Sequence, residues 1–232
     1  GDGRRRWVVV IGDVCGTGPE AATLTAMARH TLRAAAHHGA TPVEALEWLN
    51  EAILERHGDR FCTVLYCEMD ALEGGRWRLT TVTAGHPLAL TVPGGGKAST
   101  VGRSGTLLGV LPELRLHTDS VELDVGDTVL LHTDGITDVP DPFGIDEANL
   151  ARMVTESATA AGAEAVAEQL RAELDDVLPL DEREDDIALV VIRVGDHPAV
   201  DEPDAVFEAS FACDPAEIAT AREFAVAGGL PN

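Results

Sequence analysis

Hydrophobic and polar residues alternate with two different periods along the chain, and the first third combines one strand with two helices. Trp7 to Ile11 is an unbroken apolar run, typical of a strand buried on both faces. Pro19 opens a helical pattern that continues to about His38. Thr41 then caps a second helix, with Glu44 completing a capping box and core-spaced apolar residues leading to Arg56.

From Phe61 the period becomes that of β-strands separated by glycine turns. The strand-like stretches are "FCTVLYCEMD", "RWRLTTVTAG", "PLALTV", "LRLHTDSVELD" and "DTVLLHTDG". Two helices are expected over residues 146–157 and 163–178, followed by the apolar strand "DIALVVIRV". This order is not a regular β-α alternation. It predicts an α+β fold in which antiparallel sheets are covered by helix pairs.

The two ends of the chain differ from this central domain. Residues 1–3 read as a hairpin turn, so we expect a strand to precede them and to be missing from the domain at 1–194. Residues 195–205 have the polar, proline-bearing composition of a linker. Residues 206–232 offer one strand and one amphipathic helix, too few elements for a core, and are read as the truncated start of a second domain.

The charge of the chain excludes several classes of partner. The 232 residues include 40 acidic and 17 basic ones, for a net charge of −23. Such a chain is not expected to bind nucleic acid or an anionic membrane surface. No apolar run is long enough for membrane insertion, and the four scattered cysteines favour a reducing, cytoplasmic location. A phosphorylated substrate would need local positive charge, which bound cations can supply.

Four aspartates stand where apolar strands begin or end. Asp13 follows the first strand, and Asp134 follows "DTVLLHT". Asp185 and Asp186 precede the last strand. Carboxylates beside buried strands cost free energy unless they are paired, hydrogen-bonded or metal-bound, and oxygen ligands favour Mg²⁺ or Mn²⁺. Ordinary roles stay open, because Asp-Gly is a common turn pair and acidic residues before a strand are often solvated.

A nucleotide site is the competing interpretation of the first glycine turn. "GTGPEA" fits the loose dinucleotide fingerprint. That fold needs a second strand ending in an acid about 20 residues later, whereas residues 31–50 read as helix, turn and helix. No Gly-Lys-Ser/Thr follows, so a phosphate-binding loop is also excluded. His132 lies beside Asp134 and can support a ligand, although a strand histidine is more often simply packed.

Five motifs in order resemble the metal-dependent protein phosphatases of the PPM class, in the bacterial branch typified by SpoIIE and RsbU. They are "GDVCGTGPEAA", "AGHPLAL", "GTLLGV", "LLHTDGITD" and "EDDIALVVI", within residues 4–194. The resemblance implies an αββα sandwich with two Mn²⁺ or Mg²⁺ ions at one end. It implies that Asp13 bridges the ions, that the carbonyl of Val14 binds one, that Asp134 and Asp185 bind the other, and that Asp186 supports these ligands.

The resemblance also implies a reaction and partners. Water activated by the two ions would hydrolyse phosphoserine or phosphothreonine on a STAS-type anti-anti-sigma protein, in sigma-factor or stress signalling. Related proteins carry an acidic ligand on a "GGDWYD"-like strand that is not in this sequence. The helices at 19–38 and 41–56 would couple regulatory input to metal binding, with an upstream sensor domain and a homodimer as further expectations. The tail is similar to the opening of a histidine-kinase-like ATPase domain. The alternative is an inactive PPM domain that serves as a binding or regulatory module.

Overall fold

The computed structural model describes residues 6–56, 60–139, 143–178, 187–195 and 223–229, which form two antiparallel sheets. The first sheet has the order β6-β3-β2-β1-β9, with β6 (Thr118–Leu123), β3 (Trp77–Ala84), β2 (Cys62–Ala71), β1 (Arg6–Val14) and β9 (Glu223–Gly229). The second has the order β5-β4-β7-β8, with β5 (Ser99–Val101), β4 (Ala89–Val92), β7 (Thr128–His132) and β8 (Leu189–Arg193).

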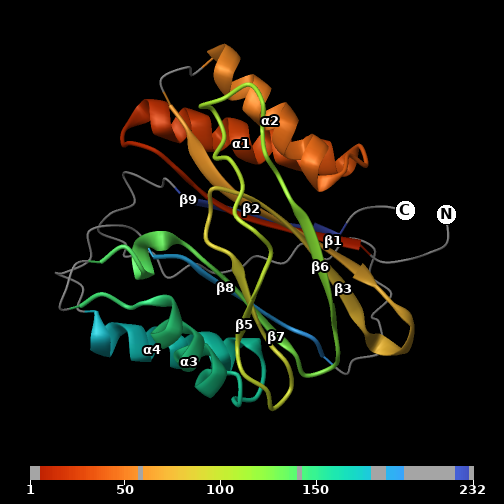
Figure 1. Cartoon of the computed structure of the whole chain (residues 1–232), viewed down its shortest axis with the longest axis vertical. Helices are drawn as coiled ribbons and strands as arrows, with labels where there is room; N and C mark the ends of the chain where they lie inside the picture. Colours follow the sequence, from red (N-terminus) through yellow and green to blue (C-terminus); the bar gives the residue numbers. More distant parts are fainter. Residues whose placement is uncertain (1–5, 57–59, 140–142, 179–186, 196–222, 230–232) are drawn as a thin grey trace.

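Helix pairs lie on the outer faces of the two sheets. Figure 1 shows α1 (Pro19–His37) and α2 (Pro42–Arg56) on one side, and α3 (Glu147–Ser157) and α4 (Ala163–Val177) on the other. A short 3₁₀ turn, η1 (Glu73–Gly75), connects β2 with β3, and a second, η2 (Asp134–Ile136), lies between β7 and α3.

Three layers of buried apolar residues hold this arrangement together. The first packs inward-facing strand residues such as Val10 against α1 and α2. The second lies between the sheets and joins Ile11 of β1 to Leu131 of β7. The third joins Leu130 to Leu170 of α4. Because side chains alternate across a strand, neighbours such as Leu130 and Leu131 serve different layers. The α+β fold with an αββα layer order is therefore confirmed.

The boundaries of α1 and α2 follow from their capping residues. Pro19 occupies the first turn of α1, where its missing N–H costs nothing. Before α2, the backbone N–H of Thr41 donates to Oε2 of Glu44 (2.8 Å), and the N–H of Glu44 donates to Oγ1 of Thr41 (3.3 Å). These hydrogen bonds confirm the predicted capping box. The hydrogen bonds that the Glu44 carboxylate accepts from the backbone N–H and the Oγ1 of Thr41 lower its pKa.

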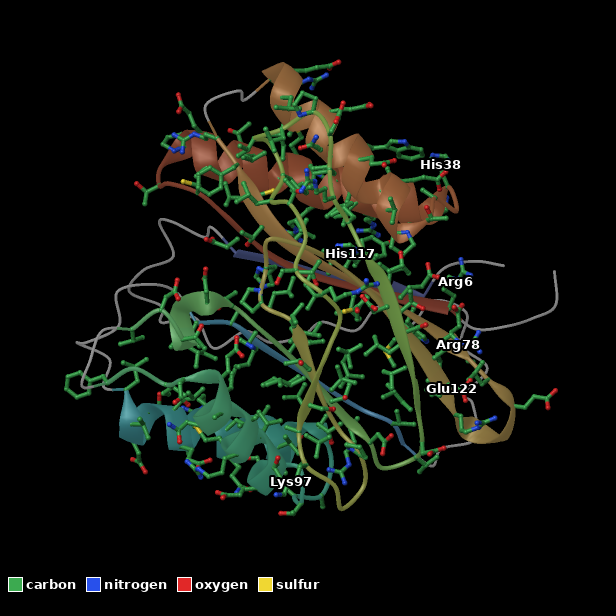
Figure 2. The ribbon with its side chains drawn as sticks, viewed as in Figure 1. Arg6, His38, Arg78, Lys97, His117 and Glu122 are labelled. Atoms are coloured by element: carbon green, nitrogen blue, oxygen red, sulfur yellow. The ribbon has the colours of Figure 1, made fainter. Side chains whose placement is uncertain are left out.

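A ladder of alternating charges crosses the first sheet at the end where β1 begins. In the strand register Arg6 lies opposite Asp70, Asp70 opposite Arg78, and Arg78 opposite Glu122. Nε of Arg6 lies 2.9 Å from a carboxylate oxygen of Asp70, and Nη2 of Arg78 lies 3.3 Å from one of Glu122. Figure 2 shows Arg6, Arg78 and Glu122 grouped on one side of the molecule. Opposite charges on adjacent strands favour this register over a slipped one.

The segment "GTLLGVL" (residues 105–111) connects β2 with α2. Leu108 exchanges two backbone hydrogen bonds of 3.0 Å with Cys62. The buried side chain of Asn50 in α2 accepts from the N–H of Gly109 (2.7 Å) and donates to the carbonyl of Leu111 (2.9 Å). Gly109 has φ +90° and faces α2 so closely that a Cβ would overlap its neighbours. Asn50 thus fixes an irregular segment against a regular helix.

The structure differs from the strand predictions in two places. "LRLHTDSVELD" forms a strand only from Thr118, because Leu114 and Leu116 pack on the helix-covered core while Arg115 hydrogen-bonds through its backbone to Thr106. The short strand β5 was not predicted, since its three residues "STV" are mostly exposed and carry no clear period.

The predicted second domain falls largely outside the described residues. Of residues 206–232 the structure describes only β9, which pairs antiparallel with β1. The separate domain and the linker at 195–205 stay predictions. Among the described helices, none has both the length and the apolar character that crossing a membrane requires.

Candidate metal centre

Asp13 lies near the end of β1, on the face that looks toward the second sheet. Ile11 and Val9, two and four residues earlier, belong to the core between the sheets, so alternation places Asp13 at the end of that layer. The residue is half-buried, and its Oδ1 atom is fully buried. Burial first and the Asp13 charge second raise the pKa of the Cys62 thiol to about 12. Because β1 continues to Val14, the predicted ligand Asp13 lies in the strand rather than in the turn after it.

Asp134 follows β7 in the second sheet and begins the turn η2. Its backbone carbonyl accepts hydrogen bonds of 2.8 Å from the N–H groups of Thr137 and Asp138, which fold the chain tightly after the strand. The residue is half-buried. Its charge also acts on His132, whose pKa it raises against the larger lowering effect of burial. The Asp134-Gly135 pair thus forms a turn, and it also places the Asp134 carboxylate in a half-buried position.

A chain of buried polar contacts joins these two strand ends. Thr63 lies opposite Asp13 in the β1–β2 register, and its Oγ1 shares a hydrogen bond of 2.8 Å with Nδ1 of His86. His86 is buried and close enough to His132 for the two rings to interact electrostatically. His132 in turn directs Nδ1 to the carbonyl of Thr133 at 2.9 Å. Asp13 and the carboxylate after Thr133 therefore lie at the same end of the sandwich.

The two histidines of these polar contacts, His86 and His132, are neutral at neutral pH. Burial, with a smaller contribution from His132, lowers the pKa of His86 to about 3. Burial also lowers the pKa of His132. Neutral rings add no positive charge beside the two carboxylates. The pattern "AGH" did not single out His86, because a lone histidine after a strand carries no sequence signal for this contact.

The third and fourth predicted acidic residues, Asp185 and Asp186, lie outside the described residues. The described chain resumes at Ile187, and the N–H of Ala188 donates to Oγ1 of Thr133 at 2.9 Å. The backbone returns this bond, from the N–H of Thr133 to the carbonyl of Ala188 at 3.2 Å. The strand that follows the acidic pair thus starts beside the strand end that leads to Asp134.

The donors fit a hard divalent cation. Asp13 and Asp134 supply carboxylate oxygens, the ligands that Mg²⁺ and Mn²⁺ prefer. Within the described part of the chain, no three His, Cys, Asp or Glu side chains are arranged to hold an ion by themselves. That part excludes Asp185, so the described residues represent only a portion of the predicted ligand set.

The turn after Asp13 is fastened to the start of β2. The N–H of Cys15 donates to the carbonyl of Phe61 at 3.0 Å, and the carbonyl of Cys15 accepts from Nη1 of Arg60 at 3.1 Å. Nη2 of Arg60 also lies 2.8 Å from Oε2 of Glu20 in the first turn of α1. The sequence did not indicate Arg60, because its partners lie 45 and 40 residues away.

The family model for Stage II sporulation protein E (SpoIIE) matches residues 3–195. This chain belongs to the SpoIIE family. Among curated proteins, it is 26% identical over 138 residues to the phosphoserine phosphatase RsbP of Bacillus subtilis (strain 168). That match covers 57% of this chain and 34% of RsbP, so the chain corresponds to about a third of its relative's length.

Solved structures show the same fold. The RsbU and RsbW domains of Rv1364c from Mycobacterium tuberculosis superpose with a TM-score of 0.66 at 30% identity, over 82% of this chain and 52% of that one. The PP2C phosphatase domain of SpoIIE from Bacillus subtilis also gives a TM-score of 0.66, at 19% identity over 82% of this chain and 55% of that one. The family match ends at residue 195, so it gives no support to the expected ATPase domain in the tail.

Proposed function

We propose that this chain is a metal-dependent protein phosphatase domain that hydrolyses phosphoserine or phosphothreonine on a STAS-type anti-anti-sigma protein. The observation that carries the proposal is the position of Asp13, near the end of β1, and Asp134, just after β7: they belong to different sheets but lie at the same end of the layer between them. Membership of the SpoIIE family and the name of its relative RsbP, a phosphoserine phosphatase, support the reaction class.

We assign the metal ligands as Asp13, the backbone carbonyl of Val14, Asp134 and Asp185, for two Mn²⁺ or Mg²⁺ ions. Asp186 would support these ligands without binding an ion itself. When bound, such cations activate water for attack on phosphorus and stabilise the charge on the phosphoryl oxygens. Asp13 is the residue that both ions would share, and its carboxylate would orient the attacking water. The neutral rings of His86 and His132 belong to the polar contacts that join the two strand ends.

The charge of the protein fits this proposal. A chain with a net charge of −23 repels a phosphorylated substrate at long range. The arginines of the ladder (Figure 2) are paired with Asp70 and Glu122. They lie at the end of β1 that begins with Arg6, whereas Asp13 lies near its other end. Cations bound at the site would therefore provide the local attraction for phosphate.

The direct test is hydrolysis of p-nitrophenyl phosphate by the full-length protein with and without Mn²⁺. Asp13→Asn and Asp134→Asn should each lower kcat by about a hundredfold or more, the scale of losing an electrostatic contact to the transition state. Asp175→Asn is the matched control, since Asp175 forms an ion pair with Arg171 within α4 and is not an assigned ligand. Full activity of Asp13→Asn would contradict the proposed ligand.

Calorimetric titration of Mn²⁺ distinguishes the alternative of an inactive binding module. An enzyme should bind the cation and release phosphate, whereas an inactive domain should do neither. Release of phosphate from a phosphorylated STAS protein then tests the substrate class. The chain covers 34% and 25% of two curated relatives that it matches, so an upstream sensor and dimerisation through the helical layer belong to this proposal as predictions for the whole protein.

A further inference from the structure

Both peptide groups that flank Cys15 are held by the residues just before β2. The first group contains the carbonyl of Val14 and the N–H of Cys15, and this N–H donates to the carbonyl of Phe61 at 3.0 Å. In a trans peptide the C=O and N–H bonds point in opposite directions. The Val14 carbonyl, a proposed metal ligand, therefore points away from Phe61. The second group presents the Cys15 carbonyl to Nη1 of Arg60 at 3.1 Å.

The guanidinium of Arg60 lies in the space that a side chain at position 16 would occupy, and position 16 is a glycine. Gly16 has φ +93°, and a Cβ at this position would overlap Nη1 of Arg60. Any L-residue here would therefore be strained and would also displace the guanidinium. The side chain of Arg60 is 20% exposed, so it lies against the turn rather than in solvent. The glycine and the arginine are thus matched across the turn.

Arg60 also connects the turn to the helical layer. Its Nη2 lies 2.8 Å from Oε2 of Glu20, in the first turn of α1. The Glu20 side chain is 73% exposed, so water and salt weaken this ion pair. The hydrogen bond to the Cys15 carbonyl, inside the turn, is the firmer of the two contacts. A planar guanidinium can make both at once, whereas a lysine ammonium is a single point of contact.

We propose that Arg60 is a positioning residue of the metal centre: it holds the turn after Asp13 in the shape that presents the Val14 carbonyl, and it ties that turn to α1 through Glu20. This inference rests on the proposed function. Arg60 acts on the backbone beside the ligands and is not assigned a contact with the substrate. Residues that orient metal ligands in this way commonly change metal affinity by about 10–100-fold when they are removed.

The test measures Mn²⁺ binding by calorimetry in the full-length protein without substrate, together with hydrogen exchange of residues 14–17 in EDTA. Arg60→Met should weaken Mn²⁺ binding at least about tenfold and speed exchange of the turn by a similar factor. Arg60→Lys should also weaken binding, because it keeps the charge but not the paired contacts. Arg171→Met is the matched control, since it removes an arginine from an exposed pair within α4 and should leave both readouts unchanged.

The outcomes separate this inference from the proposed function. Wild-type affinity in Arg60→Met, or in Arg60→Lys should Arg60→Met fail to fold, overturns the positioning role. A higher KM at unchanged Mn²⁺ affinity also overturns it, because that result assigns Arg60 to the substrate. If the wild type itself binds no Mn²⁺, the proposed function is wrong, and the metal-positioning role of Arg60 is then wrong as well. Faster exchange in Arg60→Met would then identify Arg60 as a purely structural clamp.

Discussion

Replacement of Asn50 by leucine tests how α2 holds the segment "GTLLGVL". Asn50 is 1% exposed and joins two backbone groups of that segment, the N–H of Gly109 and the carbonyl of Leu111. Leucine has the same number and branching of side-chain heavy atoms as asparagine, so the substitution removes the hydrogen bonds without opening a cavity. Its methyl groups are bulkier than the amide oxygen and nitrogen, so crowding adds to the loss of the polar contacts.

The magnitude follows from the surroundings of the two groups. Gly109 is buried, so its N–H loses its partner where water does not reach, at a cost of about 1–3 kcal/mol. Leu111 is 51% exposed, so its carbonyl can turn to water and costs only the net value of one hydrogen bond, about 0.5–1.5 kcal/mol. We expect the free energy of unfolding to fall by about 2–4 kcal/mol. With a urea m-value of about 2 kcal/mol/M, the midpoint falls by about 1–2 M.

Urea unfolding followed by circular dichroism in EDTA measures this loss without any contribution from bound metal. Glu51→Ala, at the next position of α2 and exposed, should stay within about 0.5 kcal/mol of the wild type. A midpoint for Asn50→Leu within the error of the wild type would refute the reasoning, because it would mean that the two hydrogen bonds contribute nothing net.

Three further predictions concern acid stability, strand register and metal binding. Between pH 6.5 and about 3 the unfolded chain holds a proton on His86 that the folded chain does not, so this residue costs stability as the pH falls. The His86→Gln protein should lose about 1.4 kcal/mol less than the wild type from about pH 7.5 to about pH 5.5 in urea titrations, and parallel profiles count against the pKa argument. Asp70→Arg places a third positive charge between Arg6 and Arg78 in the strand register, and should lower the free energy of unfolding by about 1–2 kcal/mol at low salt. No recovery of stability in 1 M salt argues against charge repulsion as the cause. Mn²⁺ at a hundred times its Kd should stabilise the wild type by about 2.7 kcal/mol and Asp13→Asn far less, in thermal melts against EDTA; equal shifts for both remove Asp13 from the site.

The fold could be predicted where local chemistry and period agree. The capping box at Thr41 and the proline at the start of α1 set helix boundaries that the structure reproduces within a residue. The strand at Thr118 was predicted to start too early, because Leu114 and Leu116 show a strand period but are held by packing on the helix-covered core. Alternation reports which residues are buried; it does not report whether a backbone pairs.

The site could be predicted only in part, for a different reason. Asp13 and Asp134 stood out because a carboxylate next to an apolar strand is locally costly, and that signal is contained in a few consecutive residues. Arg60 and His86 carry no such signal, since their partners come from other elements and are brought near by strand pairing. No periodicity in the chain encodes which side chains will meet across a sheet.

The register of β1 with β2 has a consequence for how this domain can vary. Val14 and Cys62 are partners in the sheet, so the chain leaves it for the α1–α2 hairpin and re-enters it at the same point. The two ends of the hairpin are therefore adjacent, and the hydrogen bond from the N–H of Cys15 to the carbonyl of Phe61 joins them. Helices of another length or sequence could replace it without shifting any strand, provided that they cover the same apolar face and hold residues 105–111 as Asn50 does. The sequence and length of the helical layer can therefore vary while the two sheets keep the distance between the carboxylates of Asp13 and Asp134.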